Sequence, residues 1–150
     1  PLMLTTGRIL YHYTTRARTG RTPELMEIEG NSFIEINTED AKKLGIENGE
    51  RVKVLSRRGE ITSEARVSDK TNPGETWMPF HFPDGDCNWL TNAALDKYAR
   101  IPEYKVCACR VEKIPESEAY TADGTYISQK LVAQLKEAEL KAEAAGIIED

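Results

Sequence analysis

Short alternations of apolar and polar residues constrain the fold of this chain most strongly. Residues 32–36 read Ser-Phe-Ile-Glu-Ile, and residues 51–56 and 61–67 again place apolar side chains at every second position. A period of two puts alternate residues on opposite faces of a strand. Asn48-Gly49 and the Arg-Arg-Gly-Glu sequence at 57–60 are turn signals between these segments. The centre of the chain therefore predicts short strands, with residues 51–67 forming a β-hairpin.

Further strands and a helix are expected on both sides of this region. The strand candidates are residues 2–4, 9–13, 75–82 and 104–114. Residues 37–40, Asn-Thr-Glu-Asp, supply an N-cap and early acidic residues for a short helix, and Gly45 stands where a C′ glycine is expected. Five or six short strands with short helices imply a mainly β protein that forms a small closed or half-closed barrel.

The character of the chain changes after Pro115. Residues 117–125 are rich in turn formers, whereas residues 128–145 consist largely of Lys, Glu, Ala, Leu and Gln, which are strong helix formers. Leu131 and Leu135 give this segment only a thin apolar stripe. We expect a β-barrel domain over residues 1–114, followed at 115–150 by a turn-rich linker and an amphipathic C-terminal helix.

Composition and cysteine usage exclude several classes of partner. The net charge of -5 and the pI near 5.2 argue against nonspecific binding to nucleic acid or a membrane surface. No apolar run approaches the roughly 20 residues that span a bilayer, so we expect no membrane insertion. Three cysteines, an odd number, fit a reducing compartment such as the cytoplasm. Cys107 and Cys109 share one face of a strand and are interpreted as structural residues, not metal ligands.

Residues 5–25 have the composition of a ligand-binding segment. Glycines, threonines and arginines crowd between and after strand-like apolar residues, and residues 8–21 contain four arginines and no acid. Threonine hydroxyls, backbone N–H groups and guanidinium groups are suitable donors for phosphate oxygens. A solvated basic loop after an edge strand is the structural alternative.

The order of motifs resembles the C-terminal molybdopterin-dinucleotide-binding domain of molybdenum and tungsten oxidoreductases, in particular that of formate dehydrogenase catalytic subunits. The resemblance begins with Leu-Thr-Thr-Gly-Arg at 4–8, His-Tyr-Thr-Thr at 12–15 and Arg-Thr-Pro-Glu-Leu at 21–25. It continues with Ile-Asn-Thr-Glu-Asp-Ala at 36–41, Ser-Arg-Arg-Gly at 56–59, Met-Pro-Phe at 78–80 and Pro-Glu-Tyr-Lys-Val-Cys-Ala at 102–108. Together these motifs cover residues 1–114.

The resemblance implies a six-stranded double-psi β-barrel that binds bis-molybdopterin guanine dinucleotide carrying Mo or W. The cofactor-contacting positions carried over to this chain are Thr6, Gly7, Arg8, His12, Tyr13, Thr14, Thr15, Phe80, Asn88 and Lys105. Three of these have structural alternatives. His12 can be a core histidine bonded to a carbonyl, Asn88 a loop cap, and Lys105 an exposed lysine at a strand end.

The residues of this chain supply little for catalysis. They contain no Ser/His/acid set, no phosphate-binding glycine motif and no metal-ligand spacing. In the resembled formate dehydrogenases, the metal ligand and the assisting His and Arg belong to other domains, and iron–sulfur clusters belong to other domains or subunits. We therefore expect a chain that is inactive alone and works with the remaining domains of the catalytic subunit and with iron–sulfur electron-transfer subunits.

Two other functions stay open. The same domain can belong to a nitrate-reductase-like or formylmethanofuran-dehydrogenase-like enzyme, or the chain can be a noncatalytic double-psi barrel that binds a protein or peptide. For the cofactor reading, we expect residues 5–15 and 80–88 to converge on one donor-rich surface. Asp84 and Asp86 are unfavourable there unless they meet amino groups or solvent. His81 is expected to face away from the cofactor if Phe80 faces it.

Overall fold

The computed structural model describes residues 1–114, 119–120 and 126–127. Contacts divide the chain into two units, Pro1–Lys113 and Ile114–Asp150. In the second unit, β7 (Ala119–Tyr120) pairs antiparallel with β8 (Tyr126–Ile127). The C-terminal helix expected over residues 128–145 lies outside the described residues. Within the described ranges, no helix is both long and apolar enough to cross a membrane.

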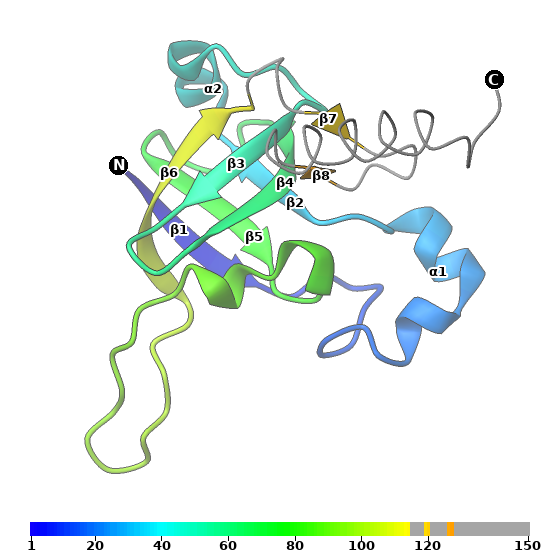
Figure 1. The fold of residues 1–150 in the computed structure, drawn as a ribbon, viewed down its shortest axis with the longest axis vertical. Coiled ribbons are helices and arrows are strands. Elements are labelled where there is room, and N and C mark those ends of the chain that lie inside the picture. Colours follow the sequence, from blue (N-terminus) through cyan, green and yellow to red (C-terminus); the bar gives the residue numbers. More distant parts are fainter. Residues whose placement is uncertain (115–118, 121–125, 128–150) are drawn as a thin grey trace, which may run out of the picture. The chain divides into compact units, whose positions relative to one another are not determined.

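The first unit is a closed six-stranded barrel with short helices, as expected (Figure 1). Around the barrel the strand order is β1-β5-β2-β4-β3-β6. The strands are β1 (Leu2–Gly7), β2 (Phe33–Ile36), β3 (Arg51–Leu55), β4 (Glu60–Val67), β5 (Glu75–Pro79) and β6 (Val106–Lys113).

Two of the six strand pairs are parallel, and they determine where the candidate site lies. β1 pairs parallel with β5, and β2 pairs parallel with β4, although each pair is far apart in sequence. The other four pairs are antiparallel and include the predicted β3–β4 hairpin. Since β1 and β5 run in the same direction and β6 runs against β1, the ends of β1 and β5 meet the start of β6 at one end of the barrel.

The barrel interior holds the apolar residues of the alternating strands. Buried side chains come from all six strands and include Leu4, Ile34, Ile36, Val52, Val54, Ala65, Met78, Cys107, Cys109 and Val111. β2 was expected to be half-buried, but all four of its residues are buried. Its outer face is covered because Phe33 packs against Trp77, with ring centroids 5.8 Å apart, and beneath the Arg66 guanidinium, 3.6 Å from the Phe33 ring. Its outward carboxylate, Glu35, pairs with Lys70 at 3.1 Å.

The helix after β2 forms as predicted. In α2 (Thr38–Leu44) the Asn37 side chain accepts from the Glu39 N–H at 2.9 Å, and Gly45 ends the helix with φ of 67°. A second helix, α1 (Pro23–Ile28), was not predicted. Its signal was present, since Thr22 stands at the N-cap position before Pro23 and Glu24 lies in the first turn.

Three predicted strands have boundaries that are wrong by two residues or more, and a fourth strand does not form. β1 continues through Gly7, so Thr5 and Thr6 belong to a strand and not to a turn, and residues 9–13 form no strand. The strand accommodates these polar side chains because both hydroxyls donate to backbone carbonyls. Thr5 Oγ1 donates to Thr76 at 3.1 Å, and Thr6 Oγ1 donates to Tyr104 at 2.7 Å. β5 ends at Pro79 and β6 begins at Val106, so both are shorter than expected.

Candidate functional site

Five of the predicted site residues meet at the barrel end described above. Thr6, Gly7 and Arg8 stand at the end of β1, Phe80 follows β5, and Lys105 precedes β6. Two backbone hydrogen bonds connect them: the Thr6 N–H donates to the Lys105 carbonyl at 3.1 Å, and the Phe80 N–H donates to the Gly7 carbonyl at 3.2 Å. The parallel β1–β5 pair thus unites motifs that are more than 70 residues apart.

Cations and aromatic rings are combined in this cluster. The Phe80 and Tyr104 rings are in edge contact, with centroids 6.3 Å apart. The Arg8 guanidinium carbon lies 5.8 Å from the Phe80 ring centre, and Lys105 Nζ lies 6.0 Å from that of Tyr104. Both cations are exposed, and among the described residues neither side chain makes a hydrogen bond or ion pair. Their charges are therefore available to an anionic ligand.

Gly7 has a packing reason of its own. A Cβ atom there would lie 2.7 Å from Nε1 of Trp77, so the indole ring requires a glycine at this position. The sequence motif alone does not reveal this contact, because Trp77 comes from β5. Gly7 remains a predicted cofactor position, but the group that approaches it closely in this structure is the Trp77 side chain.

The segment of residues 9–16 folds over the end of β5 and is held there by His81. The buried His81 ring accepts from the Ile9 N–H at Nε2, 3.1 Å away, and donates from Nδ1 to the Thr14 carbonyl, 2.6 Å away. Thr14 and Arg16 adopt left-handed conformations with φ of 45° and 63°. Each costs a non-glycine residue about 1 kcal/mol or more, so tertiary contacts must hold the segment in place.

His12 is one of these contacts. Its Nε2 donates to the Glu29 carbonyl at 2.5 Å, Nδ1 lies 3.0 Å from Thr19 Oγ1, and its ring packs edge-on to Phe82. Both ring nitrogens are thus engaged within the chain, which matches the alternative of a core histidine. A direct contact between His12 and a cofactor stays a prediction. The neighbouring predicted residues, Tyr13, Thr14 and Thr15, are exposed on the same segment.

Arg16 and Asp84 form an ion pair between the segment of residues 9–16 and the loop after β5. Arg16 donates to the Gly30 carbonyl, pairs with Asp84 at 3.2 Å and stacks over Phe82 at 4.8 Å. One of the four arginines of residues 8–21 is therefore a structural brace. The Asp84 carboxylate, which is unfavourable beside phosphate, is compensated by this pair.

Asn88 lies further along the same loop. Its N–H and its Nδ2 both donate to Asp86 Oδ1, at 2.9 and 2.7 Å, and its carbonyl accepts from Thr91 Oγ1 at 3.1 Å. This is the capping role considered as an alternative; the residue is exposed, and its amide oxygen makes no hydrogen bond within the described part of the chain. Residues 80–84 lie beside residues 9–16, as the contacts of His81 and Asp84 show. A contact between Asn88 and a ligand stays a prediction.

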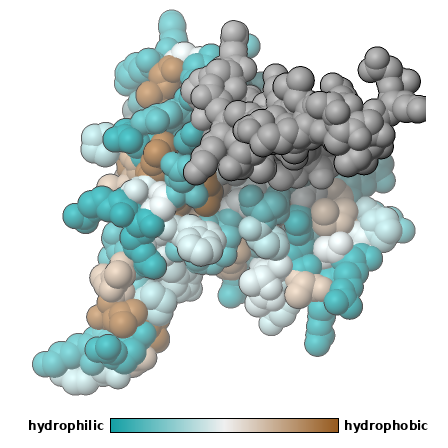
Figure 2. Space-filling model, viewed as in Figure 1, coloured by the Kyte–Doolittle hydropathy of each residue, from teal (hydrophilic) through white to brown (hydrophobic). Residues whose placement is uncertain are grey.

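A loop that sequence reasoning missed projects from the barrel at residues 92–103 (Figure 1). A Leu95–Pro102 bridge closes its stem, and Leu95, Tyr98 and Ile101 are exposed, Tyr98 to 87%. Figure 2 shows apolar surface on this loop between polar residues. At its base is a half-open hollow of about 360 Å³, lined by Ser56, Arg57, Arg58, Leu90, Asn92, Ala93 and Ala108.

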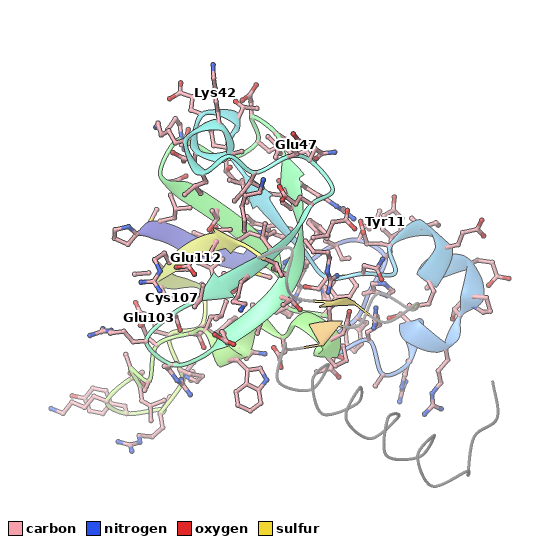
Figure 3. All side chains as sticks on the ribbon, turned by 45° about the horizontal axis from the view of Figure 1, so that its top comes forward. Tyr11, Lys42, Glu47, Glu103, Cys107 and Glu112 are labelled. Atoms are coloured by element: carbon pink, nitrogen blue, oxygen red, sulfur yellow. The ribbon has the colours of Figure 1, made fainter. Side chains whose placement is uncertain are left out.

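The thiols are not available as ligands. Cys87, Cys107 and Cys109 are free and buried. Burial raises the pKa of Cys87 to about 12, and burial together with nearby Glu103 raises the pKa of Cys107; both residues of the latter pair are labelled in Figure 3. Within the described part of the chain, no group of three or more His, Cys, Asp or Glu residues is arranged to hold a metal ion.

These features define a class of protein: a small β-barrel domain that presents two exposed cations, Arg8 and Lys105, beside aromatic rings at one end, next to the polar segment of residues 9–16. Figure 3 shows Tyr11 of that segment on the side of the barrel that carries α1. The family follows from sequence comparison, since residues 2–108 match the model of the molydopterin dinucleotide binding domain. The chain belongs to this family.

Two curated relatives show the range of enzymes that contain the domain. The F420-dependent formate dehydrogenase subunit alpha of Methanocaldococcus jannaschii is 54% identical over 114 residues, which are 76% of this chain and 17% of the relative. The nitrate reductase of Symbiobacterium thermophilum is 45% identical over 117 residues, 75% of this chain and 16% of the relative. The chain spans about one sixth of the length of these relatives.

A solved structure agrees with the fold. Acetylene hydratase from Pelobacter acetylenicus superposes with a TM-score of 0.64 at 14% identity, and the match covers 76% of this chain and 18% of that one. At this identity the match supports the barrel architecture alone.

Proposed function

We propose that this domain binds the guanine-dinucleotide form of the molybdopterin cofactor as the C-terminal domain of a formate dehydrogenase catalytic subunit. The observation that carries the proposal is the meeting of Arg8, Phe80 and Lys105 at one barrel end, where neither cation makes a hydrogen bond or ion pair with the residues that the structure describes. The barrel is of the double-psi type in this proposal, supported by its two parallel strand pairs between strands distant in sequence.

The role proposed for each residue depends on whether its polar group already has a hydrogen-bond partner among the described residues. Arg8 and Lys105 bind phosphate or pterin oxygens, and Phe80 forms an apolar wall beside them. Tyr13, Thr14, Thr15 and the Asn88 amide oxygen supply further polar contacts from the exposed loops. The Thr6 hydroxyl is already bonded to the Tyr104 carbonyl, so Thr6 fixes the start of β6 beside the cofactor.

The reaction itself resides in the cofactor and in the other domains. When bound, bis-molybdopterin guanine dinucleotide with Mo or W supplies the two-electron chemistry of formate and CO2 interconversion. In this proposal the residues of this domain bind and orient the cofactor, through the cations and rings at the end of the barrel. Iron–sulfur clusters are expected in other domains or in electron-transfer subunits. The buried free thiols favour a reducing, cytoplasmic location.

We propose formate and not nitrate as the substrate of the full-length enzyme, because this chain is 54% identical to the formate dehydrogenase relative and 45% identical to the nitrate reductase. The full-length enzyme should reduce an artificial electron acceptor with formate and should not oxidise a reduced dye with nitrate. The 150-residue chain alone should do neither. Nitrate-dependent activity without formate-dependent activity would contradict the assignment.

The projecting loop is the proposed contact with the rest of the catalytic subunit. Leu95, Tyr98 and Ile101 expose apolar surface that a larger chain would bury, and the relatives carry about five sixths of their length outside this domain. Arg57 and Arg58 at the base of the loop favour a docking segment that also carries carboxylates.

Trypsin tests this contact, since Lys97 and Arg100 lie on the loop. In the isolated full-length subunit, both sites should resist cleavage, and Tyr98→Ser should make them sensitive. Ile28→Ser, which changes an exposed apolar residue on α1, should not. Cleavage that stops only when another subunit or a higher protein concentration is present would assign the loop to that partner and contradict the proposal.

A further inference from the structure

His81 occupies a position from which it controls the segment of residues 9–14. It is 1% exposed, and both ring nitrogens bond to the main chain of this segment, at Ile9 and Thr14. A carbonyl oxygen only accepts and an amide N–H only donates, so the partners fix one state of the ring. Nδ1 carries the proton and Nε2 carries none.

A second proton on His81 is incompatible with this arrangement. It would place an N–H at Nε2 against the N–H of Ile9, so one of the two clamping hydrogen bonds would become a repulsive contact. The bond that fails is the one from the Ile9 N–H, whereas the Nδ1–H bond to the Thr14 carbonyl persists. No strand or helix holds Ile9 in its place, while His12 and the Tyr13 N–H hold the far end of the segment through Glu29 and Thr19. Protonation therefore releases the Ile9 end of the segment.

The groups around the ring oppose its protonation. Burial lowers the pKa of His81 most, the hydrogen bond to the Thr14 carbonyl raises it, and nearby His12 and Arg8 lower it. Among the other charged groups of the adjoining elements, Arg16 and Asp84 pair with each other beside Phe82, Asp86 accepts from Asn88, and Lys105 and Arg18 add positive charge. The net direction is downward, so the ring is neutral above about pH 6.5, the ordinary histidine pKa, and charges only as the pH falls below it.

We infer that His81 is a positioning residue for the cofactor: its neutral ring clamps residues 9–14 beside Arg8 and Phe80, and its protonation releases the Ile9 end of the segment, next to Arg8, and speeds loss of the bound dinucleotide. This inference rests on the proposed function, since it assumes that residues 8–15 contact the cofactor. His81 itself need not touch the ligand. It acts through the main chain at Ile9 and Thr14.

The test measures the rate of pterin loss from the full-length cofactor-loaded subunit as a function of pH. While the pKa lies below the working pH, the protonated fraction and hence the release rate should rise about tenfold for each pH unit lost. His81→Gln keeps a donor and an acceptor but does not titrate, so release should become nearly independent of pH. His12→Gln removes the other histidine and should keep the wild-type pH slope, although the absolute rate should change because His12 bonds to Glu29 and Thr19 and lies near His81.

Hydrogen exchange of residues 9–14 supplies a second readout that does not depend on the cofactor. In the wild type, exchange beyond the intrinsic pH effect should accelerate as the pH falls, and His81→Gln should abolish this acceleration. An unchanged pH slope of pterin release in His81→Gln would overturn the inference. So would exchange that responds to His81 while pterin release does not. A full-length subunit that never contains pterin would instead refute the proposed function.

Discussion

Replacing Arg8 by alanine should weaken cofactor binding with little effect on folding. The guanidinium makes no hydrogen bond or ion pair with the described residues, and it lies 5.8 Å from the centre of the Phe80 ring. An exposed cation–π contact is worth about 0.5 to 1 kcal/mol, whereas a charged hydrogen bond to a phosphate is worth about 1.5 to 3 kcal/mol. The second range corresponds to about a tenfold to hundredfold loss of affinity.

Arg16→Ala is the matched control, because this arginine comes from the same segment but is engaged within the protein. Its contacts to Gly30, Asp84 and Phe82 predict a loss of about 1 to 3 kcal/mol in the free energy of unfolding. The assay is pterin content of the full-length subunit after gel filtration at limiting cofactor, together with chemical denaturation. Full cofactor occupancy with strong destabilisation in Arg8→Ala would refute the assignment of Arg8 to the ligand.

Three further predictions test the packing around the site. Gly7→Ala places a Cβ 2.7 Å from Trp77 Nε1 and should lower the free energy of unfolding by about 1 to 3 kcal/mol; an unchanged denaturation midpoint would contradict the contact. Cys87, buried and with its pKa raised to about 12, should react with a thiol reagent at pH 8 only after unfolding, as followed by mass spectrometry; rapid labelling of the native protein would contradict its burial. Asn37→Ala removes the α2 cap and a 2.7 Å bond to the Thr71 carbonyl and should cost about 2 kcal/mol in denaturation, whereas a loss below about 0.5 kcal/mol would show that the cap is dispensable.

Local signals were sufficient for the central hairpin and for α2. The alternation of residues 51–67 and the turn between them predict the β3–β4 hairpin, and Asn37 and Gly45 delimit α2 as their chemistry requires. These features depend on neighbours a few residues apart. The motif order, by resemblance, also predicted a six-stranded barrel, which the structure has, but not which strands pair.

Tertiary contacts decided the rest of the site. Thr5 and Thr6 look like turn residues, but partners 71 and 98 residues away accept their hydrogen bonds and place them inside β1. Ile9 looks like a strand residue, yet its N–H bonds to the His81 ring. The polar composition of residues 5–16 therefore indicated a ligand-binding segment but could not separate the free Arg8 from the engaged Arg16. Only the contacts in three dimensions make that distinction.

The structure of the full-length subunit with its cofactor tests the central claim most directly. The account predicts a guanine dinucleotide at the barrel end formed by β1, β5 and β6, with a phosphate or pterin oxygen within hydrogen-bond distance of the Arg8 guanidinium and the ligand beside Phe80. A dinucleotide bound against another face of the barrel, with Arg8 and Lys105 in solvent or in contact with protein alone, would contradict it.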